Sequence, residues 1–316
     1  MEYFDFLRRR EFQICQNKSA VHFTGPNMAI PTSATSPPLP ANPGRVRLLV
    51  WPREHGAWGI LLIPLITGAA AGSREGHNII SLALFVVSAL AMFCLRTPVE
   101  TLLELTPWRA QTELEKRAVY VMLGLDTSVA ALSLGLLLIW RGAYLLLALG
   151  AAVFVIFLAQ AAVKTLGREN RWASQLVGSL GLTSTAAGAF YVVTGRLSAD
   201  AFLFWGLNWL FAANQIMYVQ MRIGASRATN RMEKFRLGRA FLNGEGLTAL
   251  LLLGAWLRGI LPAALVLAFL PVAYRGTIWF FQKPAPLRIH RLGLSELGHA
   301  ILFGVLLIAA LFLAPK

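Results

Sequence analysis

The stretch AYLLLALGAAVFVIFLAQAAV, residues 143–163, contains no charged side chain in 21 residues. An α-helix needs about 20 mostly apolar residues to cross the hydrocarbon core of a bilayer, so this stretch predicts a membrane-spanning helix. Similar apolar stretches lie on both sides of it, at residues 57–72, 79–95, 119–140, 173–194, 201–219, 237–257, 260–281 and 297–313. The sequence therefore predicts an all-α, polytopic transmembrane helical bundle of about nine spans.

The composition excludes an ordinary soluble core. Hydrophobic residues make up 56% of the chain and charged residues 14%, whereas charged residues make up about 25% of typical soluble domains. The net charge is +14, but the sequence offers no soluble basic domain to bind a nucleic acid. We expect the lipid bilayer as the partner instead, because basic residues are attracted to the anionic lipids of the inner leaflet.

Lysine and arginine residues fall almost wholly on alternate connections between the spans. One set of connections carries Arg96, Arg109, Lys116, Arg117, Lys164, Arg168, Arg171, the basic run 222–239, Lys283, Arg288 and Arg291. The other set carries Arg74, Arg141, Arg196 and Arg258, with Lys316 at the end of the chain. Because basic connections stay in the cytoplasm, this asymmetry predicts a cytoplasmic N-terminus and an external C-terminus.

Residues 1–44 differ in kind from the rest. Their Pro, Ser and Thr content predicts a disordered cytoplasmic leader before a transmembrane domain at residues 45–316. Met28 is an alternative start of the native chain. The two cysteines, Cys15 and Cys94, have no spacing typical of a disulfide framework, a metal site or a haem attachment.

Polar residues at membrane depth are costly, so each cluster of them is a candidate site. The first cluster is Arg53, Glu54 and His55 at the entrance to the first span, flanked by Trp51 and Trp58. One interpretation makes the tryptophans interface anchors and Arg53 a topology charge. The other interpretation makes Glu54 and His55 adjacent titratable groups beside a ligand.

The second cluster follows the span at residues 79–95 and comprises Arg96, Glu100 and Glu104, with Pro98 between them. Pro98 is expected to stop or kink the helix. If the helix resumes, Glu100 and Glu104 share one face of it. A solvated helix cap and a binding site are both open at this point.

The third cluster ends the span at residues 201–219. Asn214, Tyr218 and Arg222 are four positions apart, so they form one polar stripe on an otherwise apolar helix. Such a stripe faces protein or water rather than lipid, and we expect it to line a cavity.

Other polar residues inside the spans or at their ends are Asp126, Asn208, Asn243, Glu245, Arg275, Glu296 and His299. Glu245 and Arg275 are opposite charges, which are expected either to form a structural ion pair or to serve a ligand. Glu296 is expected to complement the dipole at the start of the last helix. The span at residues 173–194 is rich in small residues, which predicts a central place in the bundle.

The segments PREHGAW at residues 52–58, YVQMR at 218–222 and RLGLSEL at 291–297 are distinctive. They resemble the YwiC-like family of bacterial integral membrane proteins, and the resemblance covers about residues 48–314. It implies a multi-pass protein of the bacterial inner (plasma) membrane and implies no particular activity.

The expected architecture is also remotely similar to that of the intramembrane prenyltransferases of the UbiA type. Those enzymes carry Asp-rich motifs where the second and sixth helices reach the cytoplasmic side, and Mg²⁺ bound there neutralises a diphosphate leaving group. This chain has Arg96, Glu100 and Glu104 at the first position and Asn214, Tyr218 and Arg222 at the second, with no Asp at either. We therefore expect no metal site and no cofactor.

The leading hypothesis is a bundle that holds an anionic lipid or isoprenoid-like ligand in a cytoplasm-facing cavity, because Arg matches phosphate or carboxylate oxygens without a metal. The expected ligand-binding residues are Arg53, Glu54, His55, Arg96, Glu100, Asn214, Tyr218, Arg222, Glu245 and Arg275. Arg96 and Arg222 would cradle the head group, and His55 and Glu100 are the acid/base candidates if the protein is an enzyme. The alternatives are a small-molecule transporter or permease, a membrane assembly factor and, more weakly, a haem or quinone redox protein.

Overall fold

The computed structural model describes residues 43–52, 55–103, 109–167, 170–226, 228–283 and 286–313. They belong to one compact unit, Ala41–Lys316. Of the predicted leader, residues 1–42 lie outside the described residues, and Pro43 and Gly44 begin the first described helix. Every regular element in these ranges is a helix. The bounds are α2 Pro43–Val50, α3 His55–Gly72, α4 Ile79–Leu102, α5 Glu113–Arg141, α6 Leu145–Thr165, α7 Arg171–Thr183, α8 Thr185–Thr194, α9 Ala199–Gly224, α10 Arg231–Leu237, α11 Arg239–Leu257, α12 Ala263–Leu267, α13 Leu270–Phe281 and α14 Ile289–Leu313.

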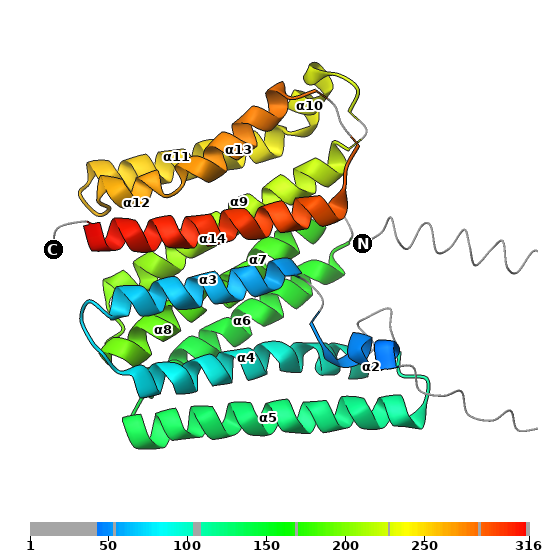
Figure 1. Ribbon diagram of the computed structural model, residues 1–316, viewed down its shortest axis with the longest axis vertical. Helices are drawn as coiled ribbons and strands as arrows, with labels where there is room; N and C mark the ends of the chain where they lie inside the picture. Colours follow the sequence, from blue (N-terminus) through cyan, green and yellow to red (C-terminus); the bar gives the residue numbers. More distant parts are fainter. Residues whose placement is uncertain are drawn as a thin grey trace, which may run out of the picture. The chain divides into compact units, whose positions relative to one another are not determined.

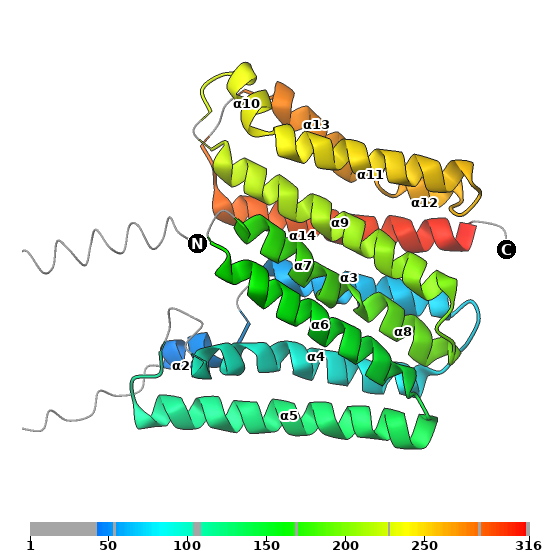
Figure 2. The ribbon, with the colours of Figure 1, turned by 180° about the vertical axis from the view of Figure 1, so that it is seen from behind.

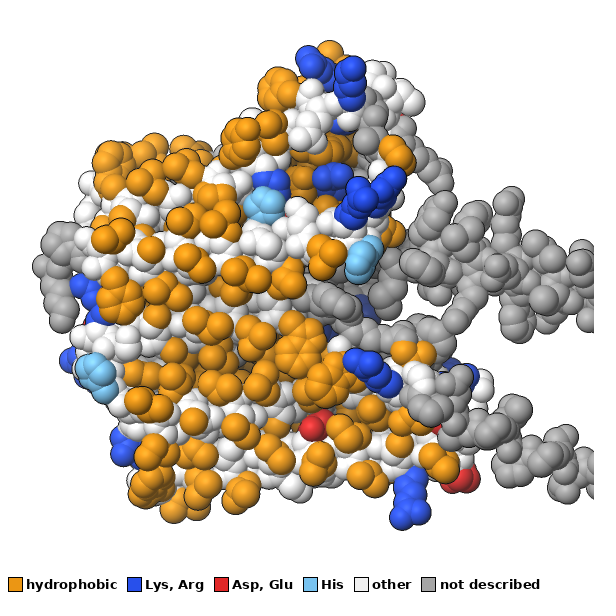
Figure 3. All heavy atoms as spheres, viewed as in Figure 1, with side chains coloured by type: hydrophobic (Ala, Val, Ile, Leu, Met, Phe, Trp, Pro, Cys, Tyr) orange, Lys and Arg blue, Asp and Glu red, His pale blue; other side chains and the backbone are white. Residues whose placement is uncertain are grey.

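Seven helices of the described part are long and apolar enough to cross a membrane. They are α4, α5, α6, α7 joined with α8, α11, α12 joined with α13, and α14. The shorter apolar helix α3 and the polar-striped helix α9 run through the bundle beside them. Neither is among the seven, so the count of about nine spans stays a prediction. Apolar side chains cover the middle of the face shown in Figure 3, while most lysines and arginines lie near its edges. The expected all-α, polytopic membrane fold is confirmed.

Consecutive passes run in opposite directions, so the connections alternate between the two ends of the bundle (Figures 1 and 2). The connections α3–α4, α5–α6, α8–α9 and α11–α12 meet at one end and carry Arg74, Arg141, Arg196 and Arg258. At the opposite end α4 and α9 finish and α5 and α14 begin, and we call it the basic end because Arg222, Arg288 and Arg291 lie there. The side of the membrane that each end faces stays a prediction.

Helix α8 lies at the centre of the bundle, as its small residues predict. Of the candidate spans, Trp172–Thr194 has the largest buried share, 67%. At Gly68 of α3, an added Cβ would come within 2.1 Å of the Ala186 carbonyl oxygen of α8. The two backbones therefore pack in direct contact at this point, which requires glycine.

Aromatic and polar contacts tie α9 to its neighbours. The rings of Phe211 on α9 and Phe303 on α14 stack with centroids 4.1 Å apart. The buried Asn208 of α9 donates a hydrogen bond of 2.9 Å to the Thr67 hydroxyl of α3. This hydrogen bond accounts for a polar Asn208 inside the bundle, since a buried amide needs a hydrogen-bonding partner.

Two helix ends bear on expectations from the sequence. Pro98 was expected to stop or kink the helix; it does not stop α4, which continues to Leu102, and the kink stays a prediction. Glu296 does not lie at a helix start, because α14 begins at Ile289 and Glu296 follows about two turns later. The helix-dipole explanation of Glu296 is therefore wrong, and its partner is a charged side chain described below.

Candidate functional site

The polar stripe of α9 faces the other helices of the bundle. Asn214 and Tyr218 are buried, and Arg222 is half-buried at the basic end. The next residue after Asn214, Gln215, donates a hydrogen bond of 2.6 Å to the backbone carbonyl of Glu296 on α14. The stripe is thus turned toward protein, as expected for polar residues in a membrane helix.

A buried polar network joins four helices around Arg275 of α13. Its guanidinium forms an ion pair with Glu296 of α14 and donates a hydrogen bond of 3.2 Å from Nη2 to Asn214 Oδ1 of α9. Asn214 in turn donates from Nδ2 to Glu245 Oε1 of α11. The direct ion pair expected between Glu245 and Arg275 is therefore wrong, because Asn214 lies between them and Glu296 is the paired carboxylate.

Tyr218 connects this network to Arg222. The Arg275 guanidinium carbon lies 4.1 Å from the centroid of the Tyr218 ring, a cation–π contact. The hydroxyl of the same tyrosine accepts a hydrogen bond of 2.8 Å from Arg222 Nη1. The Arg222 guanidinium carbon also lies 5.5 Å from the centroid of the Trp279 ring on α13. Arg222 is thus held in place by two aromatic side chains.

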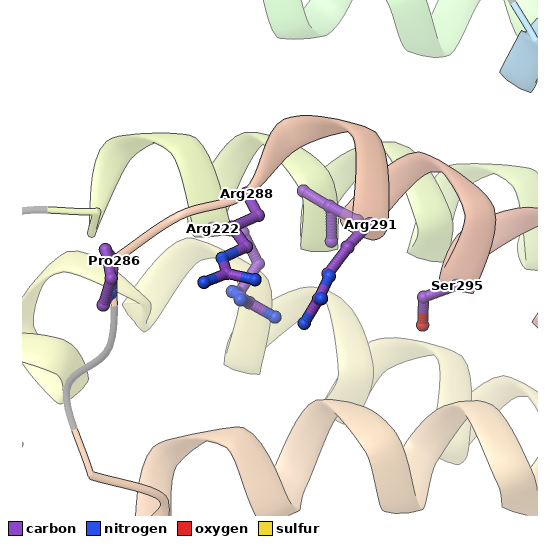
Figure 4. A pocket seen from close by; sticks show the side chains of 6 residues that line it. Arg222, Pro286, Arg288, Arg291 and Ser295 are labelled. Atoms are coloured by element: carbon purple, nitrogen blue, oxygen red, sulfur yellow. The ribbon is translucent and has the colours of Figure 1, made fainter.

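A pocket of about 410 Å³ opens beside Arg222 at the basic end. It is lined by Arg222, Pro286, Arg288, Arg291, Leu292 and Ser295. Figure 4 shows the guanidinium groups of the three arginines pointing into the same space, with the Ser295 hydroxyl on the same side. No carboxylate is among these lining residues. The arrangement offers many donors in planar forks, which suit phosphate or carboxylate oxygens.

The two arginines from the start of α14 were expected only as topology charges. Arg288 directly precedes α14, and Arg291 and Ser295 lie on the same face because the positions are three and four apart. This spacing is the signal in the sequence that could have marked the pocket. Its third arginine, Arg222, comes from a distant segment, and only the tertiary fold places it there.

Lys234 of α10 is a buried residue that the sequence hides within a basic run. Its Nζ donates hydrogen bonds of 3.2 and 2.8 Å to the backbone carbonyls of Trp279 and Gln282. Burial is the main cause that lowers the pKa of Lys234, and the positive charges of Arg222 and Arg231 lower it further. Because it satisfies carbonyls at the end of α13, Lys234 has a structural role rather than a ligand-binding one.

The remaining candidates lie elsewhere. Arg96 donates a hydrogen bond of 2.8 Å to Glu100 one turn later on α4, and α4 lies apart from α9 in both views of the ribbon (Figures 1 and 2). The structure thus groups Arg222 with the arginines near α14 instead of with Arg96. Arg53 and Glu54 lie outside the described residues, and of His55 only its place at the start of α3 is described. Acid/base roles for His55 and Glu100 stay predictions.

Metal ligands do not gather within the part of the chain that the structure describes. There, no group of three or more His, Cys, Asp or Glu side chains is placed to hold a metal ion.

The helices and their polar interior define the class of the protein, a multi-pass helical membrane protein. The family model described as YwiC-like protein matches residues 51–190, so the resemblance to that family is confirmed over this range. The arginine pocket lies in the part of the chain after the matched residues. No curated protein and no solved structure matches the chain.

Proposed function

We propose that this membrane protein binds an anionic amphipathic ligand, an anionic lipid or an isoprenoid-like phosphate, with its head group in the arginine pocket. The observation that carries the proposal is the convergence of Arg222, Arg288 and Arg291 on one space whose lining includes no carboxylate. Three neighbouring guanidinium groups repel one another, and an anion between them relieves that repulsion.

The pocket is suited to a ligand that has an apolar part. It lies at the basic end, where α13 ends and α14 begins. Its wall includes Leu292, and Leu294, two residues later on α14, is an exposed apolar side chain. A head group in the pocket would therefore leave its chain beside lipid-facing helices. With the basic end in the cytoplasm, as the charge pattern predicts, the site would meet the leaflet of the inner membrane that is rich in anionic lipids.

The test is native mass spectrometry with lipid analysis of gently purified protein. The wild type is compared with an Arg222→Gln/Arg291→Gln double variant. Arg236→Gln is the control, because Arg236 is exposed on α10 and does not line the pocket. We expect an anionic lipid that copurifies with the wild type and the control but is lost from the double variant. Equal lipid content in all three proteins would overturn the proposal.

A transporter is the second candidate, and the buried charges of Arg275 and Glu296 within the bundle favour it, since such groups mark pathways through membrane proteins. A transporter must expose its central site to both sides in turn. Engineered cysteines along the α9 stripe would then react with impermeant reagents from either side. Reactivity from the basic end alone would favour a lipid-binding protein.

A further inference from the structure

The network around Arg275 contains more carboxyl groups than its cation can neutralise. Glu296 forms the direct ion pair with Arg275, and the side chains of both residues are 8% exposed. Glu245 reaches the same guanidinium only through the neutral amide of Asn214. In the interior of a membrane protein, an ionised carboxylate without its own cation is costly.

The other charged groups near the network are directed elsewhere. On α9, Arg222 bonds the Tyr218 hydroxyl and faces the pocket. On α14, His299 lies near Glu296, and its Nδ1 is 2.7 Å from the Ser295 carbonyl. On α10, Lys234 is bonded to carbonyls at the end of α13, and α12 carries no charged residue. Glu245 therefore has Arg275 as its charged neighbour, and Arg275 is already paired.

The direction of the hydrogen bonds determines how Glu245 is held. Arginine can only donate, so the oxygen of Asn214 faces Arg275 and its amide nitrogen faces Glu245. Oε1 of Glu245 is consequently an acceptor, and its other oxygen is the one that can carry a proton. Glu245 is half-buried and lies six residues inside α11, about 9 Å from the basic end at 1.5 Å per residue.

We propose that Glu245 is a proton-binding site, which holds a proton at neutral pH while Glu296 remains ionised opposite Arg275. When a proton from the solvent binds to the Glu245 carboxylate, it forms a neutral carboxyl group. The remaining charges, those of Arg275 and Glu296, then cancel each other. Tyr218 contacts Arg275 through its ring and Arg222 through its hydroxyl, so a chain of contacts through Asn214, Arg275 and Tyr218 links the proton site to Arg222 of the arginine pocket. This proposal does not depend on the identity of the ligand in that pocket.

Infrared spectroscopy of the full-length protein in lipid tests the assignment directly. We expect the spectrum of the wild type minus that of Glu245→Gln, at neutral pH, to contain the carbonyl band of a carboxylic acid. The same difference taken in an Asp126→Asn background should retain the band, because Asp126 is a separate buried carboxyl group on α5. A difference spectrum that contains only ionised-carboxylate bands would overturn the proposal.

Thermal unfolding provides a second, independent readout. Glu245→Gln replaces a neutral carboxyl with a neutral amide, so we expect its melting temperature to match the wild type. Glu296→Gln leaves the Arg275 charge without its ion-pair partner, so we expect a marked decrease. A decrease in Glu245→Gln as large as in Glu296→Gln would contradict a protonated Glu245. Neither measurement needs an anionic ligand, so both are independent of the lipid analysis.

Discussion

At the scale of single residues, Tyr218 positions Arg222 for the pocket. Its hydroxyl accepts the 2.8 Å hydrogen bond from Arg222, while its ring packs on Arg275. Tyr218→Phe keeps the ring and removes the hydroxyl. A hydrogen bond to a charged group contributes about 1.5–3 kcal/mol, so we expect anionic-lipid binding to weaken about tenfold or more. Lipid titration by native mass spectrometry measures the change, and Tyr274→Phe, at an exposed position on α13, is the control.

The same residue scale gives a stability prediction for the ion pair. Arg275→Gln leaves the Glu296 carboxylate buried without its cation, which costs about 3–5 kcal/mol in comparable buried pairs. The double variant Arg275→Gln/Glu296→Gln removes both charges, so we expect it to recover much of that loss. Unfolding of the two single variants and the double variant in detergent completes a double-mutant cycle. Strictly additive losses would show that the pair does not couple.

At the scale of helices, the contact between α3 and α8 depends on Gly68. An alanine there would place its Cβ 2.1 Å from the Ala186 carbonyl oxygen, so the helices must separate. Overpacking of this kind costs about 1–3 kcal/mol, and we expect Gly68→Ala to lower the melting temperature. Gly135→Ala on α5 is the matched control, because nothing lies within 4 Å of the added methyl group. Equal melting temperatures for both variants would argue against the close helix contact.

The helices themselves could be predicted because long apolar segments in a membrane must satisfy their backbone hydrogen bonds internally. The central place of Trp172–Thr194 also followed from its small residues, which allow close packing. The partners of charged residues could not be predicted in this way. Glu296 and Glu245 are both carboxylates at plausible depth, and the choice between them as the ion-pair partner of Arg275 depends on how α11, α13 and α14 are rotated.

The candidate site was likewise predicted only in part. The spacing of Asn214, Tyr218 and Arg222 placed them on one inward face, and the structure has them there. The arginines near the start of α14 looked like ordinary topology charges, because their spacing alone does not say which helix they approach. Burial of Lys234 has no local signal at all, since its partners are carbonyls of α13.

At the scale of the whole molecule, the charge asymmetry predicts that the basic end faces the cytoplasm. Single cysteines are introduced at Arg236 and Arg258, which are exposed at opposite ends, in a background without Cys15 and Cys94. In intact cells an impermeant maleimide should label the position-258 cysteine, and it should label the position-236 cysteine only after the membrane is permeabilised. The reverse pattern would invert the proposed orientation and place the arginine pocket outside.

The last prediction joins the two proposed sites through Tyr218. If Glu245 loses its proton as the pH rises, the new negative charge competes with Glu296 for Arg275, whose contact with Tyr218 leads to Arg222 of the pocket. Anionic ligands should then bind less tightly, and by linkage their binding should favour the protonated Glu245. Wild-type protein should therefore lose bound anionic lipid from mildly acidic to mildly alkaline pH, while Glu245→Gln, which stays neutral, should lose much less. Retention is measured by native mass spectrometry after equilibration at each pH, with the lipid's own titration as a reference. Identical pH profiles for the two proteins would show that the proton site and the pocket act independently.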